Sequence, residues 1–121
     1  MADATTLDLE EDEIFDMANL SEARTGISGV VWISTHVSKH GPRVKYYEKA
    51  GADQPSFSVS IAESPEVVTN SLPERAVKRM SPEVIAWVEL NRAALLEFWN
   101  YGDTWMKEQV DAHLDGLVRL P

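Results

Sequence analysis

The sequence has no cysteine among its 121 residues, so disulfides, thiol nucleophiles and cysteine-ligated zinc or iron–sulfur sites are excluded. It also lacks any run of about 20 apolar residues, the length that a membrane-spanning helix needs. A secretory signal begins with a basic segment that is followed by an apolar one, whereas the first residues of this chain are acidic. We therefore expect no secretory signal and a cytoplasmic location. The length and the apolar content of 44% suit one domain with a single core.

Basic residues are missing from the N-terminal segment of the chain. Residues 1–22 hold eight acids and no lysine or arginine, whereas residues 23–121 hold 12 acids and 11 bases. A segment with so much charge buries too little apolar surface to offset the entropy lost on ordering. We therefore predict an acidic, largely disordered arm over residues 1–22 and a single α+β domain over residues 23–121. The apolar residues between Ile14 and Leu20 leave open whether the end of the arm packs on this domain.

Apolar and polar residues alternate in three segments, 30–37, 43–49 and 56–62, as they do in strands with one buried face. Turn segments that contain glycine and proline separate them. Strands joined in sequence by short turns predict an antiparallel meander. A short extended stretch at residues 66–68 gives a fourth candidate strand. The sheet is thus predicted to have three or four strands.

The second half of the chain has helical periodicity. Ser71-Leu72-Pro73-Glu74 has the form of a capping box and predicts a helix start. Ser81-Pro82 predicts a break or sharp kink, because a proline disfavours helical geometry in the residue before it. The helix that follows is expected to end at Gly102. Its predicted buried stripe comprises Val84, Ile85, Trp87, Val88, Leu95, Leu96, Phe98 and Trp99.

A last helix is predicted after Gly102, with Asp103 or Thr104 as its N-cap. Its predicted buried stripe comprises Met106, Val110, His113, Leu114 and Leu117. The fold expected from these patterns is an α+β domain in which a kinked helix pair and a C-terminal helix pack on one face of the antiparallel meander.

The helical half contains a run of residues with a recognisable spacing: Leu72-Pro73-Glu74-Arg75-Ala76, then Trp87, Asn91-Arg92, Leu95 and Trp99. This run resembles a small bacterial family of a domain of unknown function, whose members have a strand meander followed by L-P-x-R-A, a tryptophan, an H/N-R pair and a closing L-x-x-x-W. The resemblance covers about residues 26–99. It implies a protein partner, because members are often encoded beside another small protein in toxin–antitoxin-like pairs. It implies no chemistry.

The chain departs from that family in two places. Members usually have a histidine-rich stretch at the second strand, where this chain has His40-Gly41-Pro42-Arg43-Val44, so a role for those histidines carries over at most to His40. The chain is also longer by a few residues around Ser81-Pro82. Among the shared polar positions, Arg75 and Arg92 are predicted to form structural ion pairs, and Glu89 is spaced to reach Arg92.

The sequence contains no recognised catalytic or metal-binding motif. His36 and His40 straddle a strand end and a turn, and His113 is far away in the sequence, which does not match a known zinc or iron pattern. There is no G-x-S-x-G elbow, P-loop or G-x-G-x-x-G segment. We therefore expect no metal, no cofactor and no enzyme. A small hydrolase or nuclease with an unrecognised site stays open as an alternative.

The strand alternation predicts a sheet face that the helices do not cover. If Val31, Ile33, Val37, Val44, Tyr46, Phe57, Val59 and Ile61 lie under the helices, the opposite face carries Trp32, Ser34, His36, Arg43, Lys45, Tyr47, Ser56, Ser58 and Ser60. Aromatic, basic and hydroxyl side chains on an open sheet suit binding. The alternative is an outer face that is only solvated, with Trp32 shielded by Lys45 or by the arm.

The open face predicts a non-catalytic protein-interaction or regulatory module, expected in the cytoplasm. The resemblance to the small bacterial family implies that this module is one member of a two-protein, toxin–antitoxin-like pair. A nucleic-acid-binding domain that uses the open sheet face is the first alternative. It is not favoured, because the body of the chain is nearly neutral and the motif of RNA-binding sheets is absent. The acidic arm is further predicted to mask the open face until a partner displaces it.

Overall fold

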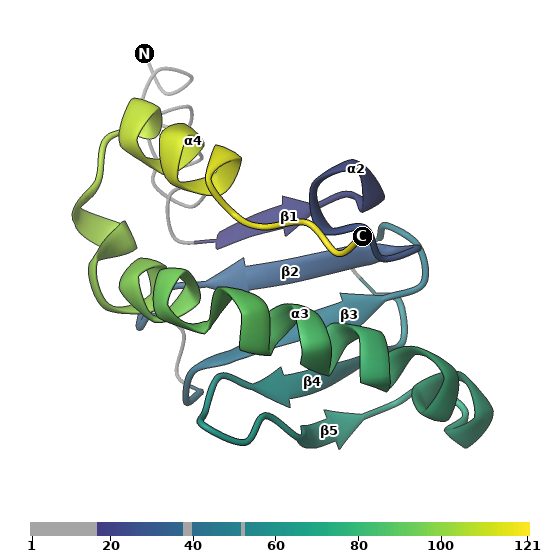
Figure 1. Ribbon diagram of the computed structural model, residues 1–121. Coiled ribbons are helices and arrows are strands. Elements are labelled where there is room, and N and C mark those ends of the chain that lie inside the picture. The colour runs from purple at the N-terminus through teal and green to yellow at the C-terminus, as the bar shows by residue number, and fades with distance from the viewer. Residues whose placement is uncertain (1–16, 38–39, 52) are drawn as a thin grey trace, which may run out of the picture.

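The computed structural model describes residues 17–37, 40–51 and 53–121, and it has an α+β fold in which one long helix lies across a five-stranded sheet (Figure 1). The strands are β1 (Met17–Leu20), β2 (Val30–Ser34), β3 (Arg43–Tyr47), β4 (Ser56–Ser60) and β5 (Val67–Asn70). The helices are α2 (Glu22–Thr25), α3 (Glu74–Tyr101), the 3-10 helix η1 (Gly102–Thr104) and α4 (Lys107–Asp115). The predicted α+β class is confirmed, but the predicted count of three or four strands is too low.

The five strands lie in the sheet in the order of the sequence, and each is antiparallel to the next. This arrangement confirms the predicted meander of β2, β3 and β4. The last strand, β5, begins within the extended stretch predicted at residues 66–68. The first strand, β1, is not predicted, because only Ala18 and Leu20 face the core and four residues are too few to reveal a period of two.

The strand β1 also changes the N-terminal boundary of the domain. The predicted arm over residues 1–22 extends too far, since Met17–Leu20 pairs with β2 and α2 begins at Glu22. Burial of Leu20, which is only 1% exposed, together with the β1–β2 backbone pairing, outweighs the local acidity. The remainder of the predicted arm, residues 1–16, lies outside the described residues.

The core lies between α3 and the sheet face that turns toward it. Alternation along β2, β3 and β4 points every second side chain at the helix. The buried residues that the strands and the residue after β4 supply are Val31, Ile33, Val44, Tyr46, Phe57, Val59 and Ile61, as predicted. From α3, the predicted residues Val84, Trp87, Val88, Leu95, Phe98 and Trp99 are buried, with Ile85 and Leu96 half-buried. The choice of the covered face is therefore confirmed.

The predicted break at Ser81-Pro82 is wrong, because α3 is one helix of 28 residues with Pro82 inside it. Ala76 and Met80 before the proline and Val84 and Trp87 after it are all buried, so packing on the sheet holds both halves in one helix. The side chain of Pro82 itself is exposed. Among the described residues, no helix has the length and apolar character required to span a membrane.

The predicted capping box at Ser71 is also absent, since the N-cap of α3 is Pro73 and has no side-chain hydrogen bond. The Ser71 hydroxyl accepts a hydrogen bond from the backbone N–H of Ser56 at 3.1 Å, and the Ser71 N–H donates to the carbonyl of Ser56 at 2.8 Å. Ser71 therefore ties the start of α3 to β4. The hydroxyl that the sequence assigns to the helix end extends the sheet pairing instead.

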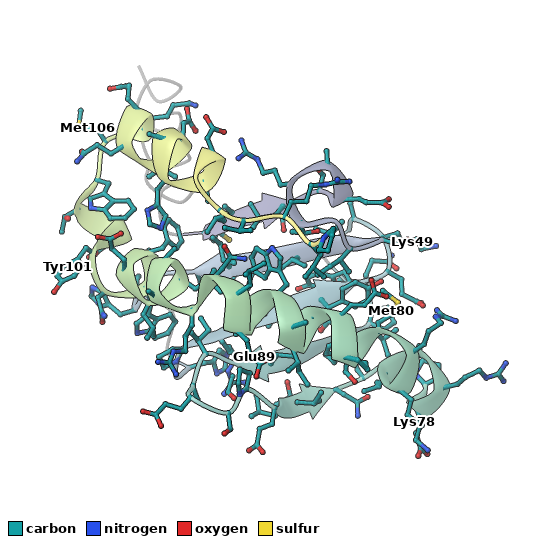
Figure 2. The ribbon with its side chains drawn as sticks, in the orientation of Figure 1. Lys49, Lys78, Met80, Glu89, Tyr101 and Met106 are labelled. Atoms are coloured by element: carbon teal, nitrogen blue, oxygen red, sulfur yellow. The ribbon has the colours of Figure 1, made fainter. Side chains whose placement is uncertain are left out.

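The helix α3 ends at Tyr101, as predicted, and η1 leads to α4. The N-cap of α4 is Met106 rather than Asp103 or Thr104, and the Gln109 side chain accepts a hydrogen bond from the Met106 N–H at 2.8 Å. Val110 and Leu114 are buried as predicted, but Met106 is 65% exposed and points outward at the start of α4 (Figure 2). As the N-cap, Met106 precedes the helix and is not part of its buried stripe.

His113 fastens α4 to α3, where it is half-buried as part of the predicted stripe. Its Nε2–H donates to the carbonyl of Ala94 at 2.8 Å, and Nδ1 lies 3.6 Å from a carboxylate oxygen of Glu97. The ring lies against Trp105, with 4.8 Å between the ring centroids. His113 is therefore occupied by contacts that hold the C-terminal helix in place.

The buried polar residue of α3 is Asn91, which is 4% exposed. Its amide group donates to the carbonyls of Trp87 at 3.0 Å and Val118 at 2.9 Å, and its oxygen accepts from the Val118 N–H at 2.7 Å. The C-terminal segment is tied down a second time where the Leu120 N–H donates to the carbonyl of Thr25 at 2.9 Å. Asn91 thus satisfies its own polar atoms by anchoring the chain beyond α4.

The predicted ion pairs of Arg75 and Arg92 are not formed within the described part of the chain. Arg75 is exposed and Arg92 is half-buried, near Glu63 and Glu89 in a shallow hollow on the outer side of α3. Figure 2 shows Glu89 on this outward side of the helix. In the Asn91-Arg92 pair, the asparagine is therefore the residue with the structural role.

Trp87→Ala tests the packing of α3. Trp87 is fully buried, so its removal leaves a large cavity and should lower the free energy of unfolding by about 3–5 kcal/mol. Leu90→Ala is the matched control on the exposed side of the same helix, where Leu90 is 49% exposed, and it should change the free energy little. Urea unfolding measures both values. Equal small losses in the two variants would contradict the core described above.

Asn91→Leu tests the anchoring of the C-terminal segment. The leucine keeps the volume but leaves the N–H and carbonyl of Val118 without their partners, so we expect a loss of about 1–3 kcal/mol. Amide hydrogen exchange should accelerate at Val118 and Leu120 more than in β3. Unchanged exchange at Val118 would show that the segment is held by other contacts.

Candidate binding surface

The sheet face opposite α3 carries a row of side chains that the register aligns across the strands. Asn19, Trp32, Lys45, Ser58 and Thr69 are successive neighbours along this row. Figure 1 shows α3 in front of the sheet, so this open face turns away from the viewer. We define the open face by its side chains from all five strands: Met17, Asn19, Val30, Trp32, Ser34, Arg43, Lys45, Tyr47, Ser56, Ser58, Ser60 and Thr69.

Trp32 is the centre of the open face. The Lys45 ammonium lies 5.2 Å from the centroid of the indole ring, in the geometry of a cation–π contact. The indole N–H donates to the sulfur of Met17 at 3.3 Å. Trp32 is therefore half-buried, with Lys45 over its ring and Met17 at its edge.

A groove of about 510 Å³ lies beside Trp32 on the open face. Its walls come from β1, β2, β3 and the loop that follows β3. The lining residues are Met17, Asn19, Leu20, Ser21, Val30, Trp32, Lys45, Tyr47, Ala50 and Gly51. The Tyr47 phenol is neutral at pH 7 and can donate a hydrogen bond, and burial raises its pKa further. The groove thus combines aromatic and aliphatic walls with one ammonium group.

Of the predicted site residues, the groove contains Trp32, Lys45 and Tyr47. Arg43 and Ser60 lie on the same face, opposite each other in β3 and β4, and both are half-buried. They border the surface without lining the groove.

Ser34 and Ser58 are also on the predicted face, but they are buried, at 4% and 1% exposure. Their hydroxyls, together with the Nε of Arg43, have no hydrogen-bond partner among the described residues. A serine next to larger side chains in a sheet is covered by them, which the alternation pattern does not reveal. Ser34 and Ser58 are therefore part of the base of the surface rather than exposed contact residues.

The placement of His36 on the open face is wrong. β2 ends at Ser34, so the alternation that assigns His36 and Val37 to opposite faces no longer applies. The backbone N–H of His36 donates to the carbonyl of Trp99 at 2.8 Å, and its Nε2 lies 3.1 Å from a carboxylate oxygen of Asp103. His36 thus joins the end of β2 to the end of α3. Val37, predicted to be covered, is 53% exposed.

Sequence reasoning missed the half of the groove that β1 and its flanks supply: Met17, Asn19, Leu20 and Ser21. The acidity of the surrounding segment places these residues in the predicted arm over residues 1–22. The available signal is the pattern of Ala18 and Leu20, which alternates with Met17 and Asn19, but it is too short to distinguish from chance. Val30 and the loop residues Ala50 and Gly51 complete the groove from the other side.

No three histidine, aspartate or glutamate side chains converge on a common point in the described ranges in a way that would hold a metal ion. The pair of His36 and Asp103 has the spacing of a hydrogen-bonded imidazole and carboxylate. Its second contact, from the His36 backbone to Trp99, gives it a structural role at the end of α3.

Comparison with known proteins found no family model, no curated protein and no solved structure that matches this chain. The resemblance to the small bacterial family therefore stays a prediction. The chemistry of the open face carries the functional proposal.

Trp32→Ala tests whether Trp32 belongs to the surface rather than to the core. Its ring is only half-buried and its contact with Lys45 is near solvent, so the free energy of unfolding should fall by about 1 kcal/mol. Urea unfolding beside Trp87→Ala provides the comparison, and Trp32→Phe controls for loss of the indole N–H. A loss as large as that of Trp87→Ala would mean that Trp32 is a core residue.

Proposed function

We propose that this protein is a non-catalytic protein-interaction module that binds a segment of a partner protein in the groove on the open face. The observation that carries the proposal is the combination, in one groove of about 510 Å³, of the Trp32 ring, the Tyr47 phenol and the Lys45 ammonium. Aromatic side chains supply contact area at low cost in conformational entropy. A single ammonium group adds preference for a carboxylate.

The chemistry of the groove favours a particular kind of partner segment. Apolar lining from Met17 and Val30 suits an apolar anchor side chain. Lys45 suits an acidic residue beside that anchor. We propose an acidic segment with one or two large apolar residues as the ligand, supplied by the second member of a small bacterial two-protein pair in the cytoplasm.

Nucleic-acid binding by the same face has less support. Sheets that bind single-stranded RNA stack bases on exposed aromatic rings, whereas Lys45 lies over the Trp32 ring at 5.2 Å. Arg43 is half-buried, and its Nε is enclosed without a partner in the described part of the chain. Few cations on this face are therefore free for phosphates.

Capture of partners from an extract of the native host tests the proposal. The double variant Trp32→Ala/Lys45→Glu removes the ring and reverses the charge of the groove, and it should lose at least 90% of the bound partner. The matched control is Leu90→Ala/Arg92→Glu, which makes the same kind of change in the hollow on the outer side of α3. It should retain the partner. Equal recovery by both variants would contradict binding through the open face.

Salt and nuclease treatment separate a protein partner from a nucleic acid. Nucleic-acid binding should fall by orders of magnitude between about 50 and 200 mM salt, because it depends on counterion release from phosphates. With one ammonium in a largely apolar groove, capture of a protein partner should weaken far less. Loss of capture after nuclease treatment would favour the nucleic-acid alternative.

A further inference from the structure

The chain enters the described fold at the wall of the groove. Met17 is the first residue of β1, lines the groove, and accepts the hydrogen bond of the Trp32 indole. Residues 1–16 are therefore joined directly to a residue that lines the proposed binding site. An extended chain of this length reaches about 50 Å, more than twice the roughly 20 Å across five strands.

The composition of residues 1–16 is complementary to the groove. The segment has seven acidic residues and no lysine, arginine or histidine. Of its apolar side chains, Ile14 and Phe15 lie closest to Met17, three and two positions before it. The groove offers apolar walls and the Lys45 ammonium. This is the combination of acidic and apolar residues expected of the partner segment.

We infer that residues 1–16 occupy the groove of their own chain, with Ile14 or Phe15 as the apolar anchor and the neighbouring carboxylates beside Lys45. The regulatory consequence rests on the proposed function, because a partner must then displace this segment in order to bind. The occupancy itself does not depend on any partner.

The tether makes such occupancy feasible without strong contacts. A segment joined directly to its site has an effective concentration on the order of millimolar, so modest affinity fills the groove for much of the time. An exposed ion pair is screened by salt. The groove is therefore occupied in part, and more at low ionic strength than at high. A partner with the same chemistry and a larger contact area can replace the segment.

The full-length chain allows a direct test by NMR. The double variant Ile14→Ser/Phe15→Ser removes both anchors and keeps all the charges, and Thr5→Ser/Thr6→Ser is a matched control farther from the groove. The resonances of the Trp32 indole N–H and of the Lys45 and Tyr47 amides should shift in the first variant and stay unchanged in the second. The indole N–H of Trp105, which lies beside His113 on α4, serves as an internal reference. Unchanged groove resonances in the first variant would overturn the inference.

The absence of cysteine allows a second measurement on the same chain. A nitroxide on Thr6→Cys should broaden the amides of Lys45 and Ser58 on the open face more than those of Leu90 and Arg92 on the outer side of α3. Ile14→Ser/Phe15→Ser added to the labelled chain should abolish this preference. Broadening that is equal on both faces would overturn the inference.

A mixture of isotope-labelled chains without nitroxide and unlabelled chains with it distinguishes an intramolecular segment from that of a second copy. Broadening that appears only when the isotope label and the nitroxide are on the same chain, and not in the mixture, supports occupancy by the chain's own segment. Broadening of equal size in the mixture would overturn it in favour of exchange between molecules.

The outcomes separate this inference from the proposed function. If Ile14→Ser/Phe15→Ser shifts the groove resonances but no partner is captured through the open face, the inference stands and the proposed function fails. If Trp32→Ala/Lys45→Glu abolishes capture while the groove resonances are insensitive to Ile14→Ser/Phe15→Ser, the inference alone fails. When both hold, the Ile14→Ser/Phe15→Ser variant should recover at least twofold more partner than the wild type does at a subsaturating concentration.

Discussion

The packing of α3 on one face of the sheet is the contact on which the rest of the structure depends. Seven buried apolar residues of this helix belong to one core cluster with the apolar side chains of the strands, and Trp87, Val84 and Val88 are fully enclosed. Burial of this kind is the main favourable contribution to folding, and it requires both layers at once. A single helix across a twisted sheet covers one face. The other face is left without a covering helix, and the groove lies on it.

Polar contacts at three points along α3 fix its position on the sheet. Ser71 bonds with the backbone of Ser56 just before the helix begins, and the N–H of His36 bonds with the carbonyl of Trp99 near its end. Between them, Asn91 holds the C-terminal segment at Val118. Apolar packing is not directional, whereas these hydrogen bonds are, and they select one placement of the helix and of the chain ends.

Alternation along the strands predicts the residues of the covered face well, but it predicts those of the open face only in part. Alternation correctly assigns Trp32, Lys45 and Tyr47 to this face, because successive side chains of a strand point in opposite directions. It fails for His36, since the strand ends at Ser34 and the pattern gives no sign of that end. It also cannot show that Ser58 is covered by its neighbours. Direction is local, but accessibility depends on side chains from other strands.

The sequence by itself determined the α+β class, the meander of three strands, the covered face and the helical stripe around Trp87, because each has a repeated period that spans several residues. Only the tertiary structure decided that β1 joins the sheet, that α3 continues through Pro82, and that Asn91 anchors the C-terminal segment. In each of these cases a local preference is weak or contrary, and contacts with residues far away in the sequence outweigh it. The groove belongs to this second group, since its walls come from strands that are brought together only by folding.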